Sequence, residues 1–216
     1  MEKLKNDGEL GNLAEIIGIM IGDGCLYLDP LNKYQTTISF NKKEKDYLYY
    51  VKNLFEEYFK YKFCITEAEN ELLLRNTSVF VGKTLIESGL INGNKVKNKV
   101  VIPNWILQNK SFTSRTIRGI FDTDGCVYCK YGKYAQIQIK MASPETISSI
   151  RSALTFLGFS PTNIQKNHNK QYLDWSFYLS RQEEIKSFFD KIKPMNSKHI
   201  LRYNKIKNGD TGTFHT

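Results

Sequence analysis

The chain contains an internal repeat, which limits its possible folds more than any other feature of the sequence. Residues 18–27 (GIMIGDGCLY) align with residues 119–128 (GIFDTDGCVY) at an offset of 101 positions (119 − 18). The same offset, kept without gaps, aligns further identical residues: Gln35 with Gln136, Ile38 with Ile139, Glu44 with Glu145, Phe55 with Phe156, Leu72 with Leu173 and Lys97 with Lys198. Because such a repeat reflects a repeated structural unit, we expect two copies of one fold, residues 1–109 and 110–216.

Both copies show the same order of hydrophobic periods, helical spacing followed by strand-like alternation. In the first copy, helices are predicted at 11–23, 43–59 and 78–88, and strands at 25–29, 34–41, 62–67 and 71–76. In the second copy, helices are predicted at 112–124, 144–157 and 181–190, a hairpin over 126–141, and strands near 162–166 and 171–178. Gly24 is expected to end the first helix in the left-handed conformation. The predicted class is α+β, with two pseudo-symmetric αββαββα units.

The net charge and the aromatic content indicate a folded protein with a polyanionic partner. Lys and Arg number 31 against 22 Asp and Glu, a formal charge of +9, and such an excess favours a polyanion. Hydrophobic residues make up 41% and aromatic residues 13%, which excludes a disordered basic tail. No apolar run approaches the ~18 residues of a membrane span, and the N-terminal residues do not resemble a signal peptide. We therefore expect an intracellular, cytoplasmic protein without a membrane partner.

The four cysteines and three histidines are assigned no chemical role. Cys126 and Cys129 form one C-x-x-C pair, but a structural zinc site needs two further ligands. His168 and His199 lack the spacing of metal ligands. The simpler interpretation is reduced thiols in a reducing compartment.

Each copy ends its first helix with an Asp-Gly pair, which contains Asp23 or Asp124. Taken alone, such a pair is an ordinary turn, and only the duplication argues for more. Small residues recur one helical turn apart on both helices: Gly18 and Gly22 on the first, Gly119 and Thr123 on the second. This spacing lets two helix backbones approach closely, so packing through these faces would place Asp23 beside Asp124.

Two carboxylates at the negative ends of two helices repel each other unless a cation lies between them. Mg²⁺ prefers carboxylate, carbonyl and water oxygens, and divalent ions stabilise both the attacking and the leaving oxygen in phosphodiester cleavage. The sequence therefore predicts a divalent-metal site at Asp23 and Asp124, with the backbone carbonyls of Gly22 and Thr123 as further ligands.

The two duplicated segments resemble the signature helices of a known enzyme family. Residues 16–24 (IIGIMIGDG) and 117–125 (IRGIFDTDG) are similar to the two motifs of the monomeric LAGLIDADG homing endonucleases, most closely the intron-encoded enzymes of archaea. The similarity extends over nearly the whole chain. The first motif departs from the family at Ile21, where an acidic residue is common, whereas the second retains Asp122. In the family, this position does not bind metal.

This resemblance implies how the fold would act on DNA. In the family, the final acidic residue of each motif binds the metal, and it corresponds here to Asp23 and Asp124. The resemblance implies Mg²⁺, or another divalent cation such as Mn²⁺, as cofactor. The two LAGLIDADG helices would pack at the central interface, and a saddle-shaped antiparallel sheet would cover the double-stranded DNA.

The family also has a basic residue near each scissile phosphate, late in each half, where it stabilises developing charge. The corresponding residues are Lys97 and Lys198, with Lys95, Lys99 and His199 as nearby alternatives. Lys42 opens a helix in a further cluster of lysines and is a candidate for DNA contact. Most such charges are solvated or contact phosphates without regard to sequence.

Uncharged hydrogen-bonding side chains line one face of the central strands in both copies. Such groups bind base edges, and a two-stranded ribbon fits the major groove, whereas a plain solvent-facing surface is the alternative. The candidates for base contacts are Gln35, Thr37, Ser39 and Asn41 in the first copy and Tyr134, Gln136, Gln138 and Lys140 in the second, with Arg75, Tyr172, Asp174 and Ser176 on later strands. Because the two faces differ, we expect an asymmetric DNA target.

The sequence and the resemblance together favour a monomeric, site-specific homing endonuclease that makes metal-dependent double-strand breaks in a long DNA target and leaves short 3′ overhangs. Two other classes stay open. One is a non-cleaving binder on the same scaffold, either an intron RNA maturase or a DNA-binding regulator. The other is a basic scaffold protein, whose affinity for nucleic acid would disappear with salt.

Overall fold

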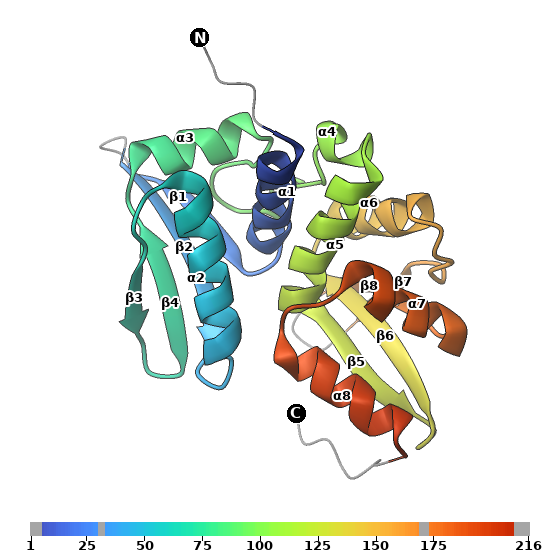
Figure 1. Cartoon of the computed structure of the whole chain (residues 1–216). Helices are drawn as coiled ribbons and strands as arrows, with labels where there is room; N and C mark the ends of the chain where they lie inside the picture. The colour runs from blue at the N-terminus through green and yellow to red at the C-terminus, as the bar shows by residue number, and fades with distance from the viewer. Residues whose placement is uncertain (1–5, 30–32, 169–172, 210–216) are drawn as a thin grey trace.

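Two helices, α1 (Asp7–Ile21) and α5 (Lys110–Asp124), lie side by side at the centre of the molecule, with a four-stranded sheet on each side of them (Figure 1). The structure, a computed structural model, describes residues 6–29, 33–168 and 173–209. Each central helix begins at an asparagine cap. Asn6 and Glu9 form a capping box on α1, which explains why this helix starts before the predicted position 11. The Asn109 side chain accepts backbone N–H groups at the start of α5.

The N-terminal unit contains α1 and six further elements: β1 (Gly24–Leu28), β2 (Tyr34–Asn41), α2 (Lys45–Phe59), β3 (Cys64–Glu67), β4 (Glu71–Asn76) and α3 (Val79–Glu87). The short helix α4 (Asn104–Leu107) leads to the C-terminal unit, which contains α5, β5 (Gly125–Lys130), β6 (Tyr134–Met141), α6 (Pro144–Phe156), β7 (Gln165–His168), β8 (Leu173–Leu179), α7 (Gln182–Ile192) and α8 (Ser197–Lys207). Both sheets are antiparallel, with orders β1-β2-β4-β3 and β5-β6-β8-β7.

The α+β class and the αββαββα order of each unit are confirmed. The structure adds α4 and α8, which the hydrophobic pattern does not predict. Of the residues of α8, only His199 and Ile206 are buried, so its sequence shows little helical periodicity. Within the described residues, no helix combines the length and apolar character needed to cross a membrane.

The prediction that Gly24 ends α1 in the left-handed conformation is wrong. The helix ends at Ile21, Gly22 caps it with a φ of −73°, and Gly24 already belongs to β1. Gly24 does not have a positive φ. Its role is steric, because a Cβ atom there would lie 2.5 Å from Met20 Cα. The glycine is therefore needed for a close approach between the end of the helix and the first strand.

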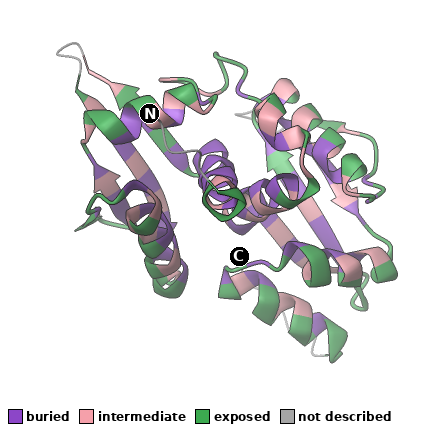
Figure 2. Ribbon diagram, turned by 45° about the horizontal axis from the view of Figure 1, so that its top comes forward, coloured by how far each residue is buried: buried purple, intermediate pink, exposed green. Residues whose placement is uncertain are grey.

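Two glycines in the contact between α1 and α5 let the helix backbones approach closely, as the spacing of small residues predicts. A Cβ atom at Gly119 would lie 2.6 Å from Glu15 O and 2.7 Å from Ile19 N, and one at Gly18 would overlap the carbonyl of Thr116. The inward residues of both helices are buried (Figure 2). Larger side chains at the two glycines would force the helix backbones apart.

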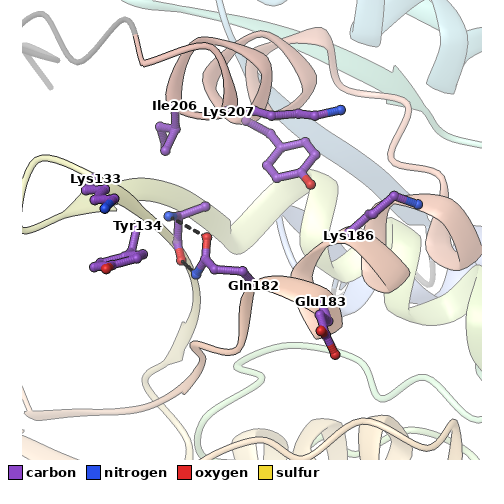
Figure 3. A pocket seen from close by; sticks show the side chains of 9 residues that line it. Lys133, Tyr134, Gln182, Glu183, Lys186, Ile206 and Lys207 are labelled. Atoms are coloured by element: carbon purple, nitrogen blue, oxygen red, sulfur yellow. Dashed lines mark hydrogen bonds between the residues drawn. The ribbon is translucent and has the colours of Figure 1, made fainter.

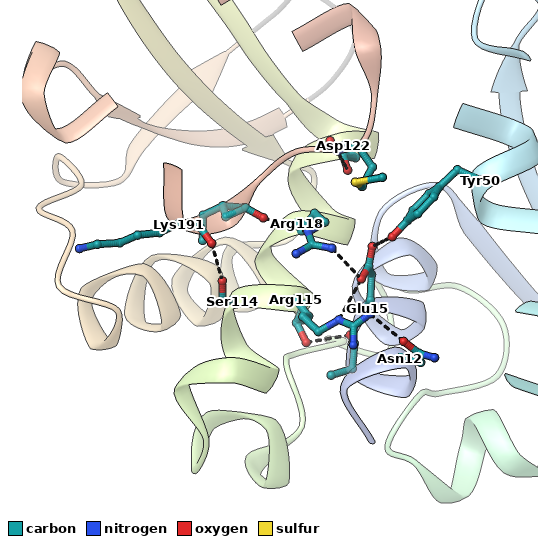
Figure 4. Close-up of polar contacts among 12 residues, drawn as sticks. Asn12, Glu15, Tyr50, Ser114, Arg115, Arg118, Asp122 and Lys191 are labelled. Atoms are coloured by element: carbon teal, nitrogen blue, oxygen red, sulfur yellow. Dashed lines mark hydrogen bonds and ion pairs between the residues drawn. The ribbon is translucent and has the colours of Figure 1, made fainter. Parts of the chain in front are cut away.

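A buried charge cluster joins the two units beside the same helix pair (Figure 4). Glu15 on α1 is 1% exposed, and its Oε2 accepts from Arg115 Nε at 3.1 Å and from Arg118 Nη1 at 3.2 Å, both on α5. Tyr50 on α2 donates to its other oxygen, and Arg115 also reaches Asn12. Removing one partner of such a cluster leaves an uncompensated buried charge, so these contacts fix how the units sit against each other.

Candidate active site

The two predicted carboxylates lie at the C-terminal ends of the two central helices. Asp124 is the last residue of α5, and Asp23 follows α1 by two residues. The helix ends are so close that a Cβ atom at Gly22 would lie 2.5 Å from Asp124 Oδ2. The charge of Asp23 also raises the pKa of Asp124. The structure therefore brings the two carboxylates together, as helix packing through small residues predicts.

Burial and mutual repulsion make this pair costly to ionise. Desolvation and the Asp23 charge raise the pKa of Asp124 to about 6 from its ordinary value of 3.8. Asp23 is an exposed residue, yet neighbouring protein atoms still desolvate its carboxylate and raise its pKa. The helix ends add partial negative charge. The site is therefore a strongly electronegative position that favours a cation.

A protein cation already occupies part of this position. Lys95 Nζ donates to Ile21 O at 3.0 Å and also to Gly22 O, both carbonyls at the end of α1. Burial lowers the pKa of Lys95, while the charges of Asp124 and Asp23 oppose that shift. The sequence offers Lys95 only as an alternative to Lys97 for the basic residue near the scissile phosphate. The structure places Lys95, from the N-terminal unit, near the two carboxylates.

Lys198 supplies the second cation, from the N-terminal turn of α8. Its Nζ lies 2.7 Å from Glu44 Oε1, and its charge lowers the pKa of Asp23 more than that of Lys95 does. Lys97, which the repeat pairs with Lys198, lies exposed on the loop before α4 and is not among the charges that shift the pKa of either carboxylate. The structure therefore places Lys95 and Lys198, and not Lys97, near the two carboxylates.

His199, another sequence-based alternative, does not act at this site. The side chain is fully buried, and its ring centroid lies 4.5 Å from that of Phe121. Burial lowers the pKa of His199 to about 3. The histidine is a packing residue between α5 and α8.

The donor atoms around the carboxylates suit a hard divalent cation. Within residues 6–29, 33–168 and 173–209, no three His, Cys, Asp or Glu side chains cluster as a metal site. The available ligands are therefore the carboxylates of Asp23 and Asp124 and the carbonyls of Gly22 and Thr123, an oxygen-only set of the kind Mg²⁺ takes together with water. The Gly22 carbonyl accepts a hydrogen bond from the Lys95 ammonium, so it would serve as a metal ligand only if Lys95 moved away.

The open faces of both sheets flank the carboxylates. In β2, Thr36, Ile38 and Phe40 are buried. The alternate residues face away from the helices, and these are the predicted Gln35, Thr37, Ser39 and Asn41. The register places Arg75 of β4 opposite Thr37 on the same face. In β6, the corresponding outward residues are Tyr134, Gln136, Gln138 and Lys140.

Several predicted contact residues are enclosed by their neighbours on this face. Gln136 is 4% exposed, because Tyr128 donates to its Oε1 and its Nε2 donates to Ser180. Ser176 is fully buried and Asp174 nearly so, since Asn167 Nδ2 donates to both, at 2.9 and 2.8 Å. Tyr172 lies outside the described residues. Base contact by the three enclosed side chains would require these hydrogen bonds to break.

Two of the predicted lysines are held in surface ion pairs. Lys42 Nζ lies 2.7 Å from Glu67, and Lys140 Nζ lies 3.3 Å from Asp174. Tyr27 is a further candidate that the strand pattern does not single out; it is 48% exposed on the open face of β1 opposite Gln35. The repeat itself offered a signal, because the equivalent position in the second copy is also a tyrosine.

A cavity of about 170 Å³ borders Asp124, and Gly22, Lys95 and Lys140 also line it. A larger cavity of about 410 Å³ lies elsewhere, between β6, α7 and α8 (Figure 3). Its Gln182 side chain is tied to the Ala135 backbone. Neither Asp23 nor Asp124 lines it, so only the smaller cavity touches the candidate site.

Comparison with known proteins agrees with this fold. Residues 111–193 match the LAGLIDADG-like domain family. No curated protein sequence matches the chain. Among solved structures, the homing endonuclease I-DmoI has a TM-score of 0.63 at 20% identity, with 86% of this chain and 97% of that chain covered. Other structures of I-DmoI hold DNA with Ca or with Mn.

Two further structures share the fold. The LAGLIDADG meganuclease I-AabMI, bound to uncleaved DNA, has a TM-score of 0.61 at 13% identity, covering 92% of this chain and 90% of that one. Full-length DUF199/WhiA from Thermatoga maritima has a TM-score of 0.58 at 12% identity, covering 99% of this chain and 65% of that one. Residues 111–193 therefore match a LAGLIDADG-like domain, and the chain has, over both of its units, the fold of the LAGLIDADG homing endonucleases I-DmoI and I-AabMI.

Proposed function

We propose that this chain is a site-specific DNA endonuclease that depends on a divalent metal. It would hydrolyse one phosphodiester in each strand of a long, asymmetric duplex and leave short 3′ overhangs. One observation carries this proposal: Asp23 and Asp124 meet at the ends of two packed helices, beside Lys95 and Lys198. The DNA-bound structures of I-DmoI and I-AabMI, which have the same fold, support it.

The side chains of the site divide the chemistry between them. Asp23 and Asp124, with the carbonyls of Gly22 and Thr123, would hold the cation. When bound, a divalent cation such as Mg²⁺ or Mn²⁺ supplies a water of lowered pKa and neutralises charge on the phosphate. Lys95 and Lys198 would stabilise the negative charge that develops on the phosphate oxygens.

The two sheet faces would select the DNA sequence. Residues 1–109 and 110–216 each present a different polar face, so each would contact one half of the target. We propose base contacts for the outward residues that are not enclosed: Gln35, Thr37, Ser39, Asn41, Arg75, Tyr134 and Gln138. Lys42 and Lys140 would contact phosphates, which position the protein without reading sequence. A single chain supplies both units, so the active species would be a monomer.

A selection from randomised DNA tests this function. The protein is incubated with a library of duplexes of random sequence, once with Mg²⁺ and once with EDTA, and the released ends are sequenced. We expect ends that share one long sequence, carry 3′ overhangs and appear only with Mg²⁺. The double variant D23N/D124N is the control and should release none.

The other outcomes identify the alternative classes. Sequence-selective binding without any cleavage would favour a maturase or a DNA-binding regulator. Binding without sequence preference that disappears with salt would favour a basic scaffold protein. Either result would contradict the proposed endonuclease.

A further inference from the structure

Helix α8 carries three basic residues on one flank, and the first copy of the repeat has no such flank. Lys198, Arg202 and Lys205 follow one another at spacings of four and three residues, so they lie on one side of the helix. At the offset of 101 residues, Arg202 corresponds to Val101. Lys205 corresponds to Asn104, where the different helix α4 begins. This basic flank is therefore an addition of the C-terminal unit.

The basic flank extends from the candidate active site to the open face of the C-terminal sheet. Its first residue, Lys198, belongs to that site and pairs with Glu44 of the N-terminal unit. Helix α8 then packs along β5, the edge strand of its sheet (Figure 1). Arg202 Nη1 lies 3.9 Å from Cys126 Sγ, and Cys126 pairs in register with Gln138 of the open face. The guanidinium therefore reaches the edge of the face on which we propose that DNA binds.

The outer part of the basic flank is free to bind an anion. Helix α8 contains no Asp or Glu. Over residues 6–29, 33–168 and 173–209, neither Arg202 nor Lys205 forms an ion pair with a carboxylate. The sulfur of Cys126 is a weak acceptor for a guanidinium, so a phosphate oxygen would displace it readily. A cation without a paired carboxylate can contact DNA at little cost.

The spacing of the three cations suits the backbone of one DNA strand. From Lys198 to Lys205 the helix rises by about 10 Å. One strand of B-DNA carries a phosphate every ~3.4 Å along the helix axis. The basic flank therefore spans roughly three consecutive phosphates, with Lys198 at the end nearest the carboxylates.

We propose that α8 is a phosphate-binding element, and that Arg202 and Lys205 bind the phosphates next to the scissile phosphate on one strand. This inference rests on the proposed endonuclease function and adds a DNA contact to its C-terminal unit. Contacts to the backbone fix the register of a protein on its duplex and carry no sequence information. Arg202 and Lys205 would thus hold the duplex against the carboxylates without touching the reacting atoms.

The salt dependence of binding in EDTA tests this contact. Wild-type protein and R202Q/K205Q are titrated onto the duplex recovered from the random library and onto a scrambled duplex of the same length, from about 50 to 200 mM salt. The slope of log association constant against log salt should be less steep by about 2 in the variant, because each phosphate contact contributes ~0.9. Affinity for the two duplexes should fall by the same factor, at least about tenfold, since these contacts do not read sequence.

A matched control removes two charges from another side of α8. Lys193 and Lys207 line a cavity of about 380 Å³ between α7 and α8, and Lys207 lies five residues after Arg202, about 140° around the helix. Lys193 has a φ of 53°, which asparagine tolerates, so the control is K193N/K207Q. It should keep the wild-type slope. Because Arg202 is half-buried and Lys205 exposed, K205Q alone, with a slope change of about 1, decides the question if R202Q/K205Q does not fold.

Ethylation of the phosphates locates the contact on the duplex. Ethylation beside one cut position, on one strand, should interfere with binding of the wild-type protein, and R202Q/K205Q should lose this sensitivity. Equal slopes for the two double variants, or an unchanged interference pattern, would overturn the inference. The endonuclease function would stand in that case, because cleavage of the selected duplex is measured separately. Failure of the wild-type protein to cut any duplex would refute both.

Discussion

Lys198 Nζ lies 2.7 Å from Glu44 Oε1, and this ion pair links the start of α8 to the start of α2. Asn196 Nδ2 donates to the same carboxylate oxygen at 3.1 Å, and Asn196 in turn caps α8. Met195 N donates to Asp122 on the central helix. The segment before α8 is therefore held between the two units, and it carries a lysine to the edge of the carboxylate pair.

Neutralising Glu44 tests what this ion pair does to Lys198. E44Q removes the charge that competes for the ammonium, and it also removes a charge that raises the pKa of Asp23. We expect the selected duplex to be cut several-fold faster, measured as a single-turnover rate in Mg²⁺. The matched control is E145Q, the equivalent position in the repeat, because Glu145 pairs with Lys99 instead. An effect of equal size from both variants would mean that the ion pair near Asp23 has no special role.

The carboxylates should be needed for chemistry and not for docking. We expect D23N and D124N each to abolish double-strand cleavage, because each removes one anionic ligand from an oxygen-only donor set. Affinity for the selected duplex should change little, since the sheet faces provide the contacts. Cleavage and gel-shift assays on the same duplex measure both. D46N, at an exposed position on α2, is the control, and cleavage at the wild-type rate by either active-site variant would refute the assignment.

The close contact of α1 and α5 at Gly119 should not tolerate an added methyl group. G119A places a Cβ atom 2.6 Å from Glu15 O, on the backbone of the facing helix. Because backbone cannot move aside cheaply, we expect a loss of ~1–3 kcal/mol in the free energy of unfolding, measured in urea. Gly8 on the same helix pair is the control, since its nearest contact would be the Asn6 side chain at 3.2 Å. G8A should be close to neutral.

The repeat explains why so much of this fold can be predicted from one sequence. Two copies of the same periodicity support each other, so the αββαββα order follows from the repeat, and the small residues on both helices add the closeness of Asp23 and Asp124. The wrong prediction for Gly24 has a different cause. An Asp-Gly pair after a helix suggests a left-handed stop, and only the position of the Met20 backbone reveals that the glycine is needed for space.

The repeat does not predict which lysine lies near the carboxylates in the N-terminal unit. Lys97 and Lys198 are equivalent in sequence, but the chain continues differently after each: into α4 and the central helix α5 in one copy, and into α8 in the other. The loop geometry therefore changes while the register does not, and Lys95, not Lys97, reaches the backbone carbonyls at the end of α1, near the carboxylates. Side-chain pairing across strands, such as that of Gln136 with Tyr128, is similarly invisible to an alternation pattern.

Buried Asp122 should make stability depend on pH. Burial and the Glu15 charge raise its pKa to about 7 from 3.8, against the lowering effects of the Met195 N–H and of Arg118. Between these values the folded protein holds a proton that the unfolded chain has lost, so stability falls as pH rises. D122N keeps an acceptor for Met195 and removes the titration.

The free energy of unfolding of the wild-type protein, relative to D122N, should therefore fall by about 2–3 kcal/mol between pH 5 and pH 8. Urea titrations across this range measure the difference. Comparing the two proteins cancels His199, whose pKa of about 3 has the opposite effect on stability near pH 6. A constant difference would mean that Asp122 is ionised in the folded protein throughout.

Two glutamines on one face of β6 allow a role in base recognition to be distinguished from a role in stability. Gln138 is half-buried, and its Nε2 donates to Tyr178 at 2.9 Å. If it contacts a base edge, Q138A should relax sequence preference at one or two target positions, each lost bidentate contact contributing ~1–3 kcal/mol. Selection from the random library, repeated with the variant, measures this change.

Gln136 lies two residues away on the same face, but it is enclosed by Tyr128 and Ser180. Q136A leaves these two partners without their hydrogen bonds, so we expect a loss of ~1–3 kcal/mol in the free energy of unfolding with an unchanged target preference. The pair of variants separates the two roles because both remove the same side chain from the same strand. A relaxed preference for Q136A and an unchanged one for Q138A would mean that the hydrogen bonds around Gln136 open when DNA binds.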